Sequence, residues 1–138
     1  MGTDTLLTLE DLSIRFGDPQ TGPTVVDRAG FTLARGETLA IVGESGSGKT
    51  LTGKALIGLL PQGASVTSGK ATMCFEDGSA DLLTLPREAM RQRRGRDIAM
   101  IFQEPLSAFS PLHTTGRQIS EVLRIHGVEG REARERTL

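Results

Sequence analysis

Short strand-like stretches make up the beginning of the chain. Along Leu6–Phe16, apolar and polar residues alternate, most clearly from Leu12 onward, as in a strand with one buried face. A turn-forming cluster at 17–23 separates this stretch from a second one over 24–34, which is interrupted at 27–29. The pattern predicts an antiparallel β layer that leads into the rest of the fold.

The following segments favour a parallel core sheet with helices. A tight turn at Arg35-Gly36 precedes the short apolar run Thr38–Val42, which we expect to be a core strand. Apolar residues at helical spacing predict a helix from Lys49 that stops at Pro61. The segment Asp97–Phe102 is continuously apolar after Asp97, which predicts another buried strand.

The remaining segments predict a hairpin and several short helices. A polar connection at 63–69 leads to a hairpin with strands at Lys70–Phe75 and Asp81–Leu85 around a turn at 76–79. A helix from Pro86 to Arg94 and, later in the chain, a loop over 106–113 follow. The last elements are a helix that ends at Gly127 and a charged helix from Gly130; the apolar face of the first carries Ile119, Val122, Leu123 and His126.

Composition narrows the class of protein. The chain has 138 residues, of which 37% are hydrophobic and 24% charged, as expected of one globular domain. A net charge of −1 provides no general attraction for nucleic acid. The single cysteine, Cys74, excludes an internal disulfide and is expected to be a small buried strand residue. Because no apolar run approaches the roughly 20 residues of a membrane span, we expect a cytosolic protein that reaches a membrane only through a partner.

Two groups of polar residues are assigned ordinary roles. Five arginines lie close together without interleaved aromatic residues, so a solvated or partner-facing surface is favoured over a nucleic-acid patch. His113 and His126 have no third ligand at a suitable spacing, so neither is expected to bind metal or take part in catalysis. The arginines are Arg87, Arg91, Arg93, Arg94 and Arg96.

The chemistry of the chain is concentrated in one loop, which reads G-x-x-x-x-G-K-T between an expected strand and an expected helix. Its glycines let the backbone turn N–H groups inward as an anion-binding nest, and the helix N-terminus adds unpaired donors. Lys49 is expected to reach the β- and γ-phosphates of a nucleoside triphosphate, and the Thr50 hydroxyl to bind Mg²⁺. An accidental Gly/Ser-rich loop is disfavoured by the flanking elements. The loop residues are Gly43, Glu44, Ser45, Gly46, Ser47, Gly48, Lys49 and Thr50.

Four segments in this order resemble the ATP-binding subunits of ABC transporters, in particular those of oligopeptide and dipeptide importers. Arg15-Phe16-Gly17 resembles the aromatic A-loop, and Val42–Thr50 resembles the Walker A sequence. Ile98–Pro105 resembles the Q-loop with its strand. Ser110-Pro111-Leu112, with Gly116–Ile119, resembles the segment after the Q-loop in peptide importers.

The resemblance implies roles for individual residues. Phe16 would stack on adenine, although it could instead be a core aromatic at a strand end. Gln103 would sense the γ-phosphate through Mg²⁺ or the attacking water and couple to the membrane subunit, although it could be a loop amide without a ligand. Lys49 and Gln103 are therefore the expected catalytic residues, and Thr50 and Gln103 the Mg²⁺ contacts. Glu104 is not assigned as a general base, because the family places that carboxylate elsewhere.

The resemblance also implies a fold and partners. The expected fold is an α/β P-loop NTPase of ABC type, with an antiparallel β subdomain and the first part of a parallel core sheet, truncated within the helical subdomain. ATP and Mg²⁺ would be the cofactors. The expected partners are transmembrane permease subunits, a second ATP-binding subunit in a homodimer or heterodimer and, indirectly, an extracytoplasmic solute-binding protein. The protein would then lie at the cytoplasmic face of the cell membrane, without nucleic acid.

Several family features are missing between residues 1 and 138. There is no apolar strand ending in Asp-Glu, no LSGGQ-type signature and no switch histidine, so the chain resembles the amino-terminal portion of the domain. Two hypotheses follow: a portion of an ATPase that energises peptide import, or a truncated remnant that binds nucleotide without hydrolysing it. A P-loop kinase or GTPase is disfavoured by the β layer and the Gln103 loop. We also expect the isolated chain to be marginally stable or aggregation-prone. The central sheet would lack several strands, which would leave an apolar face and unpaired strand edges exposed.

Overall fold

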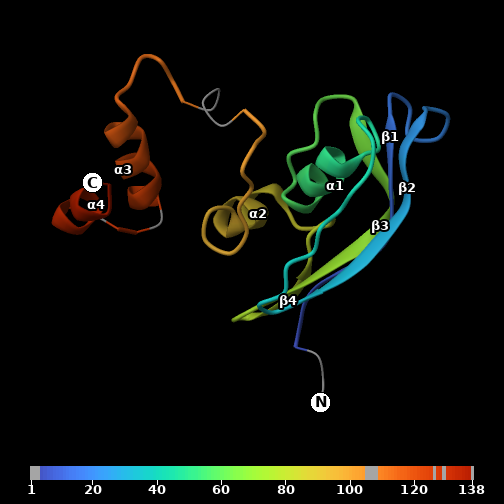
Figure 1. The fold of residues 1–138 in the computed structure, drawn as a ribbon, viewed down its shortest axis with the longest axis horizontal. Helices are drawn as coiled ribbons and strands as arrows, with labels where there is room; N and C mark the ends of the chain where they lie inside the picture. The colour runs from blue at the N-terminus through green and yellow to red at the C-terminus, as the bar shows by residue number, and fades with distance from the viewer. Residues whose placement is uncertain (1–3, 105–108, 126, 129, 138) are drawn as a thin grey trace. The chain divides into compact units, whose positions relative to one another are not determined.

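A computed structural model describes residues 4–104, 109–125, 127–128 and 130–137 (Figure 1). The chain forms two compact units, residues 1–98 and 99–138. Among the described residues, the first unit contains a sheet and two helices, and the second contains two helices. The elements are β1 (Thr5–Phe16), β2 (Thr24–Ala34), α1 (Lys49–Leu56), β3 (Ala64–Phe75), β4 (Gly78–Asp81), α2 (Arg87–Arg93), α3 (Thr115–Ile125) and α4 (Gly130–Thr137).

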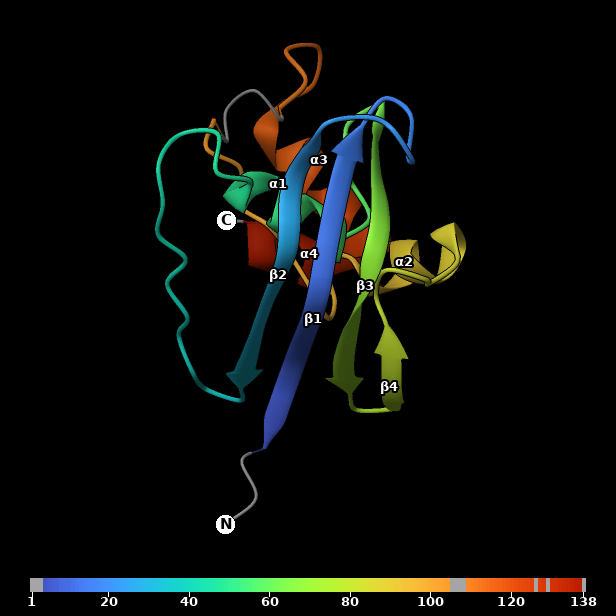
Figure 2. The same cartoon turned by 90° about the vertical axis from the view of Figure 1, so that its right-hand side faces the viewer.

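The sheet of the first unit is antiparallel throughout and has the order β2-β1-β3-β4 (Figure 2). β1 is paired on both of its edges, with β2 on one side and β3 on the other. Leu9 lies opposite Phe31 of β2 and Ala71 of β3. The predicted antiparallel layer is confirmed, and the interruption expected at 27–29 is instead a bulge within one continuous strand.

A line of irregularities crosses the sheet at one level. Asp11 and Arg28 have φ of 47° and 46°, and Gly69 has φ of 114°. The register of β1 slips beside Asp11 in both ladders. The hydroxyl of Ser13 accepts a hydrogen bond from the Arg28 backbone N–H at 3.1 Å, which supports the bulge in β2. Gly69 is required by space as well as by φ, because a β-carbon there would lie 2.6 Å from Cα of Leu12.

The core lies between this sheet and helices α1 and α2, which stand on the same side of the sheet (Figure 1). Leu12, Ile14 and Met90 are its largest fully buried side chains. Burial of such side chains is the main driving force that holds α1 against the strands. The buried members are Leu7, Leu9, Leu12, Ile14, Val26, Ala55, Leu56, Ala71, Met73, Leu82 and Met90.

The two predicted core strands do not form. Residues 38–42 and 97–102 have no strand assignment, and Val42 and Ile101 are 88% and 91% exposed. A parallel strand that is apolar on both faces needs neighbouring strands and helices on both sides. Among the described residues, no strand pairs with either segment in a sheet. These two predictions are wrong for this structure, although the antiparallel layer beside them is formed.

Several predicted boundaries also shift. α1 ends at Leu56 rather than near Pro61, because Gly58 takes φ of 62° and closes the helix in a left-handed turn. β3 begins at Ala64, within the expected polar connection at 63–69, since Ala64 pairs with Phe16. The hairpin turn is shorter than expected, and β4 at Gly78–Asp81 replaces the return strand at Asp81–Leu85. α2 matches its prediction and follows Pro86.

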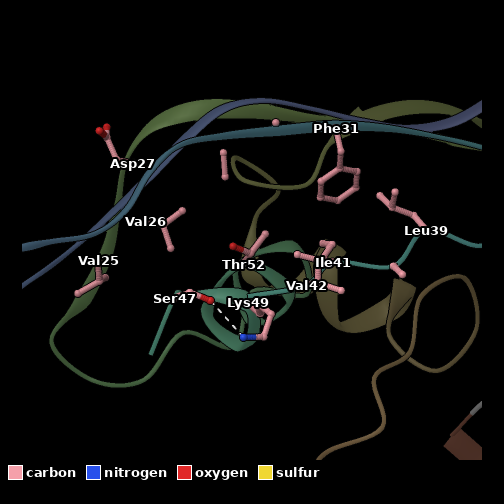
Figure 3. Close-up of a pocket in the computed structure, with 13 residues that line it drawn as sticks. Val25, Val26, Asp27, Phe31, Leu39, Ile41, Val42, Ser47, Lys49 and Thr52 are labelled. Carbon is pink, nitrogen blue, oxygen red and sulfur yellow. Dashed lines mark hydrogen bonds between the residues drawn. The ribbon is translucent and has the colours of Figure 1, made fainter. Parts of the chain in front are cut away.

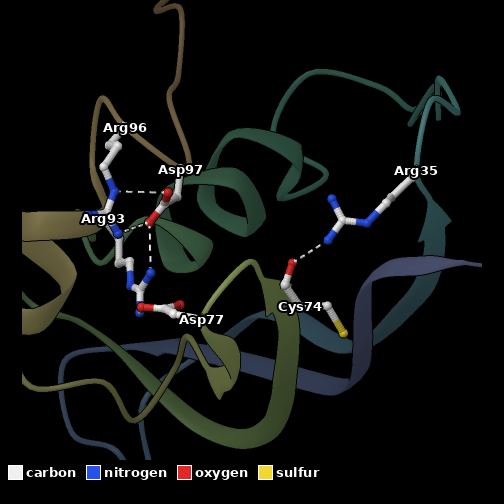
Figure 4. Close-up of polar contacts among 6 residues, drawn as sticks. All are labelled: Arg35, Cys74, Asp77, Arg93, Arg96 and Asp97. Carbon is white, nitrogen blue, oxygen red and sulfur yellow. Dashed lines mark hydrogen bonds and ion pairs between the residues drawn. The ribbon is translucent and has the colours of Figure 1, made fainter.

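Part of the arginine cluster makes structural contacts instead of forming only a solvated or partner-facing surface. Arg93, whose side chain is 20% exposed, pairs with Asp77 at 2.8 Å and with Asp97 at 3.0 Å (Figure 4). Its guanidinium carbon also lies 4.2 Å from the ring centre of Phe75. These contacts tie the tip of the β3–β4 hairpin to the end of α2. Arg91 remains exposed, as predicted. Cys74 is only half-buried in β3, and its carbonyl oxygen accepts a hydrogen bond from Arg35 at 3.3 Å (Figure 4).

The second unit is built around α3 and α4, as the pattern predicted. Gln118 secures the turn before α3: its Oε1 accepts from the Ser110 N–H at 2.8 Å, and its Nε2 donates to the His113 carbonyl at 2.9 Å. The Ser120 and Thr137 hydroxyls meet at 3.2 Å between the two helices. Gly127 has φ of 81° after α3, as expected of a helix-ending glycine. His126 and Pro105, together with 106–108 of the expected loop, lie outside the described residues.

Candidate phosphate-binding site

The loop at 43–48 runs directly into the N-terminus of α1, as predicted. Gly46 and Gly48 have φ of 83° and 89°, which other residues rarely adopt, and Gly48 caps the helix. The Ser47 N–H donates to the Glu44 carbonyl at 3.3 Å, which closes the loop on itself. The helix is then stabilised from inside by Thr52, whose backbone N–H and hydroxyl both donate to the Gly48 carbonyl, at 2.8 and 3.1 Å.

Lys49 folds back over this loop. Its Nζ donates to the carbonyl oxygens of Gly43 and Glu44, both at 2.7 Å. It also donates to the Ser47 hydroxyl at 3.1 Å (Figure 3). An ammonium group is a compact cation with three donors, and here all three are directed at oxygens of the loop. The positive charge of Lys49 is therefore held within the loop, next to the N-terminal end of α1.

Two glycines of the loop are also required by space. A β-carbon at Gly43 would lie 2.7 Å from the Ser47 Oγ and 3.8 Å from the Lys49 Nζ. A β-carbon at Gly48 would lie 2.7 Å from Cγ2 of Val26. A side chain at Gly43 would collide with Ser47, and a side chain at Gly48 would push the loop away from β2. The donor set of backbone N–H groups, a lysine and a helix N-terminus fits a phosphate group.

A cavity of about 500 Å³ adjoins the loop between β2 and the segment 39–42 (Figure 3). Ser47, Lys49 and Thr52 line one part of it. The rest is lined by Asp27 and by mostly apolar residues, among them Phe31 and Leu39. Apolar side chains contribute nothing to phosphate recognition, so the chemistry suited to an anion is confined to the part beside the loop. The apolar part is bounded by the segment in which the predicted core strand did not form.

The other predicted site residues lie in different surroundings. Thr50 is exposed in the first turn of α1, next to Lys49. Phe16 is half-buried at the end of β1, and among the described residues it is not one of the side chains that form the core. A β-carbon at Gly63 would lie 3.9 Å from Cδ1 of Phe16, so this glycine lies beside the ring. Gln103 is exposed and belongs to the second unit.

Sequence reasoning missed the residues that support the loop from outside it. Val26 forms the wall against Gly48, and Thr52 anchors the helix start, yet neither belongs to the loop motif. Val26 lies in a different element, and only the fold brings it next to the loop. Only the role of Thr52 had a signal in the sequence. It lies in the turn after Lys49, and a threonine hydroxyl in a helix can donate to the carbonyl four residues earlier.

Comparison with known proteins points to one family. A family described as ABC transporter matches residues 26–137. The chain is 49% identical to the peptidoglycan transport ATP-binding protein YejF of Agrobacterium fabrum, over 99% of this chain and 24% of the relative. It is 44% identical to the dipeptide transport ATP-binding protein DppD of Haemophilus influenzae, over 96% of this chain and 39% of the relative. It is 45% identical to the glutathione import ATP-binding protein GsiA of Shigella flexneri, over 92% of this chain and 21% of the relative.

The chain thus spans less than half the length of these relatives. None of the helices among the described residues is long and apolar enough to cross a membrane. The family match covers most of the sequence, including the loop at 43–50 and the segment around Gln103. The chain belongs to the ABC transporter family.

Proposed function

We propose that the chain is the amino-terminal portion of the ATP-binding subunit of an ABC importer for peptides or a related solute, and that its loop at 43–50 binds Mg·ATP. The observation that carries this proposal is the position of Lys49. Its ammonium group is bonded to three oxygens of a glycine-rich loop at a helix N-terminus. The oxygens of a bound phosphate can replace the loop oxygens as acceptors for the Lys49 ammonium group, and the loop supplies further backbone N–H donors.

The remaining roles follow from the family and from the placement of each residue. Thr50, exposed beside Lys49, would hold Mg²⁺ through its hydroxyl, and the bound ion would neutralise charge on the β- and γ-phosphates. Phe16 would offer its ring to adenine from the end of β1. Gln103 would approach the γ-phosphate and the ion once the complete domain has formed. Lys49 and Gln103 are therefore the proposed catalytic contributions of this part of the protein.

The proposed partners follow from the relatives, which are named as ATP-binding proteins of import or transport systems. A protein of this kind works with permease subunits in the membrane and with a second ATP-binding subunit, and it receives solute indirectly from an extracytoplasmic binding protein. The proposed location is the cytoplasmic face of the membrane, through contact with the permease.

A second candidate is a nucleotide-binding remnant without hydrolysis. The observation that favours it for residues 1–138 is the lack of an apolar strand ending in Asp-Glu in this sequence. Such a chain could hold Mg·ATP weakly but could not hydrolyse it, because the carboxylate that polarises the attacking water would be missing.

The test is equilibrium binding of a fluorescent ATP analogue with Mg²⁺, using both the 138-residue chain and a longer protein that contains it. Lys49→Ala should raise the Kd for the analogue by at least tenfold, since a charge-assisted hydrogen bond to phosphate contributes about 1.5–3 kcal/mol. Lys70→Ala, on the exposed part of β3, is the matched control and should leave Kd unchanged. Binding that does not depend on Lys49 would refute the proposal. Hydrolysis by the 138-residue chain, abolished by Lys49→Ala, would refute the remnant.

A further inference from the structure

The C-terminal end of α1 is closed in two layers. In the first layer, the Gly58 N–H donates to the Ala55 carbonyl at 3.0 Å and the Leu59 N–H donates to the Lys54 carbonyl at 2.8 Å, which is a Schellman motif. In the second layer, Arg94 reaches across from the end of α2. Its Nε donates to the Ile57 carbonyl at 2.7 Å, and its Nη2 donates to the Gly58 carbonyl at 3.1 Å.

Arg94 is well held for this contact. Its backbone N–H donates to the carbonyl of Met90, a residue that is fully buried in α2. After Arg94 the chain turns at Gly95 and returns at Ile98, which forms a parallel bridge with Arg94. A β-carbon at Gly58 would lie 3.2 Å from the Arg94 Nη2, so the guanidinium packs tightly on the end of α1. The planar fork of arginine, with its fixed donors, suits two adjacent carbonyl oxygens better than lysine does.

The same helix carries the phosphate loop at its other end. α1 has eight residues, so it is about 12 Å long, and Lys49 is its first residue. A short helix moves as a rigid body, and a small tilt about one end displaces the other end by about 1 Å, which is enough to weaken binding of a ligand that needs a fixed geometry. The cation of Arg94 also lies at the end of α1 where the helix dipole is negative.

From this geometry we propose that Arg94 is a positioning residue for nucleotide binding: it acts through α1, fixing the end opposite the phosphate loop to α2 and thereby holding Lys49 and the loop in place. The inference rests on the proposed function of the loop. Arg94 touches no phosphate itself, and sequence reasoning had grouped it with the solvated arginines.

The experiment compares Arg94→Ala and Arg94→Lys with Arg91→Ala in a longer protein that contains this chain. Arg91 is the matched control, because it lies on the same helix but its side chain is 69% exposed. Two measurements are made well below the melting temperature of each variant: Kd for a fluorescent ATP analogue with Mg²⁺, and amide exchange of the peptide that covers 43–50 without nucleotide. Arg94→Ala should raise Kd roughly three- to tenfold and speed exchange in the loop, and Arg94→Lys should have a smaller effect of the same sign.

A structural role alone would lower the melting temperature and leave both measurements as in Arg91→Ala, and that result would overturn the inference. If Arg94→Ala does not fold, Arg94→Lys decides, since it keeps the charge and loses the fork; wild-type Kd and wild-type loop exchange in that variant would overturn the inference as well. The proposed function fails separately. If the wild-type protein binds no ATP, or binds it equally well without Lys49, the proposed function is refuted. If binding depends on Lys49 but the Kd is unchanged in the Arg94 variants, only the positioning role is refuted.

Discussion

Gly48 packs against Val26 so closely that a β-carbon at position 48 would lie 2.7 Å from Cγ2 of Val26 and 3.0 Å from the Val25 carbonyl oxygen. Gly46 has a similar φ but has no heavy atom within 4 Å of where its β-carbon would stand. Gly46 and Gly48 are therefore required for different reasons. Gly46 is needed for its backbone angle, and Gly48 is needed for its angle and for the approach of the helix to β2.

Alanine substitution should separate these two requirements. Gly46→Ala should cost about 1 kcal/mol of folding free energy, which is the usual cost of a left-handed conformation in an alanine. Gly48→Ala should cost about 3 kcal/mol or more, because the overlap with Val26 adds to the same angular cost. Chemical denaturation of both variants measures the difference. Equal losses would show that the contact with Val26 relaxes at no cost.

Local patterns predicted the parts of the fold that depend on local partners. The alternation in Leu6–Phe16 located β1, the spacing after Lys49 located α1, and Gly127 marked the end of α3. In each case the residues that decide the structure lie within one strand or a few helical turns. The loop at 43–48 was equally accessible, because its glycines and lysine follow one another in the sequence.

Predictions failed where the deciding partner lies elsewhere. The polar stretch at 63–69 carries no strand pattern, yet Ala64 and Val66 pair with Phe16 and Ile14 and extend β3. Arg94 resembles its exposed neighbours in the sequence, and only the fold places it on the end of α1. The bulge in β2 also depends on the hydroxyl of Ser13 in the adjacent strand.

The bulge at Arg28 offers a site for stabilisation. Its φ of 46° is unfavourable for a residue with a β-carbon, and its side chain is 76% exposed, with a long contact of 3.7 Å to Asp27. Arg28→Gly should therefore raise the free energy of unfolding by about 0.5–1 kcal/mol, because the angular cost is removed. Thr32→Gly in the same strand is the control and should lower stability by a similar amount. A loss of stability in Arg28→Gly would mean that the arginine side chain contributes more than its bulge costs.

The arginine–aspartate cluster should make stability depend on acid pH. Hydrogen bonds from Arg96 and then Arg93 hold the pKa of Asp97 below its ordinary value of 3.8, and a hydrogen bond from Arg93 lowers the pKa of Asp77 in the same way. A carboxyl group whose pKa is lower in the folded state stabilises that state above its ordinary pKa, and the contribution is lost as pH falls through the lower folded value. The predicted loss therefore begins near pH 4 and continues below it.

Asp97→Asn tests this pH dependence. At pH 6 to 7 the variant should melt at a lower temperature than the wild type, and the gap should close as the pH falls below 4, where the aspartate of the wild type becomes protonated. Asp27→Asn, at an exposed site, is the control and should show a gap near zero at every pH. A gap for Asp97→Asn that stays constant down to pH 2.5 would show that hydrogen bonding or packing, rather than charge, accounts for its effect.

The exposed apolar segments provide the last prediction. Val42 and Ile101 are almost fully exposed although each lies in a run suited to a buried strand, because within the described residues no neighbouring strand completes a ladder around them. In the 138-residue chain, backbone amides of 38–42 should therefore exchange at the shortest labelling time. In a longer protein that contains this chain and more of the ABC domain, they should become protected as strands form. Amides of Leu7 and Leu9 in β1 are the internal control and should be protected in both proteins, since β1 is paired on both edges. Fast exchange at 38–42 in the longer protein would show that this segment is not a core strand at all.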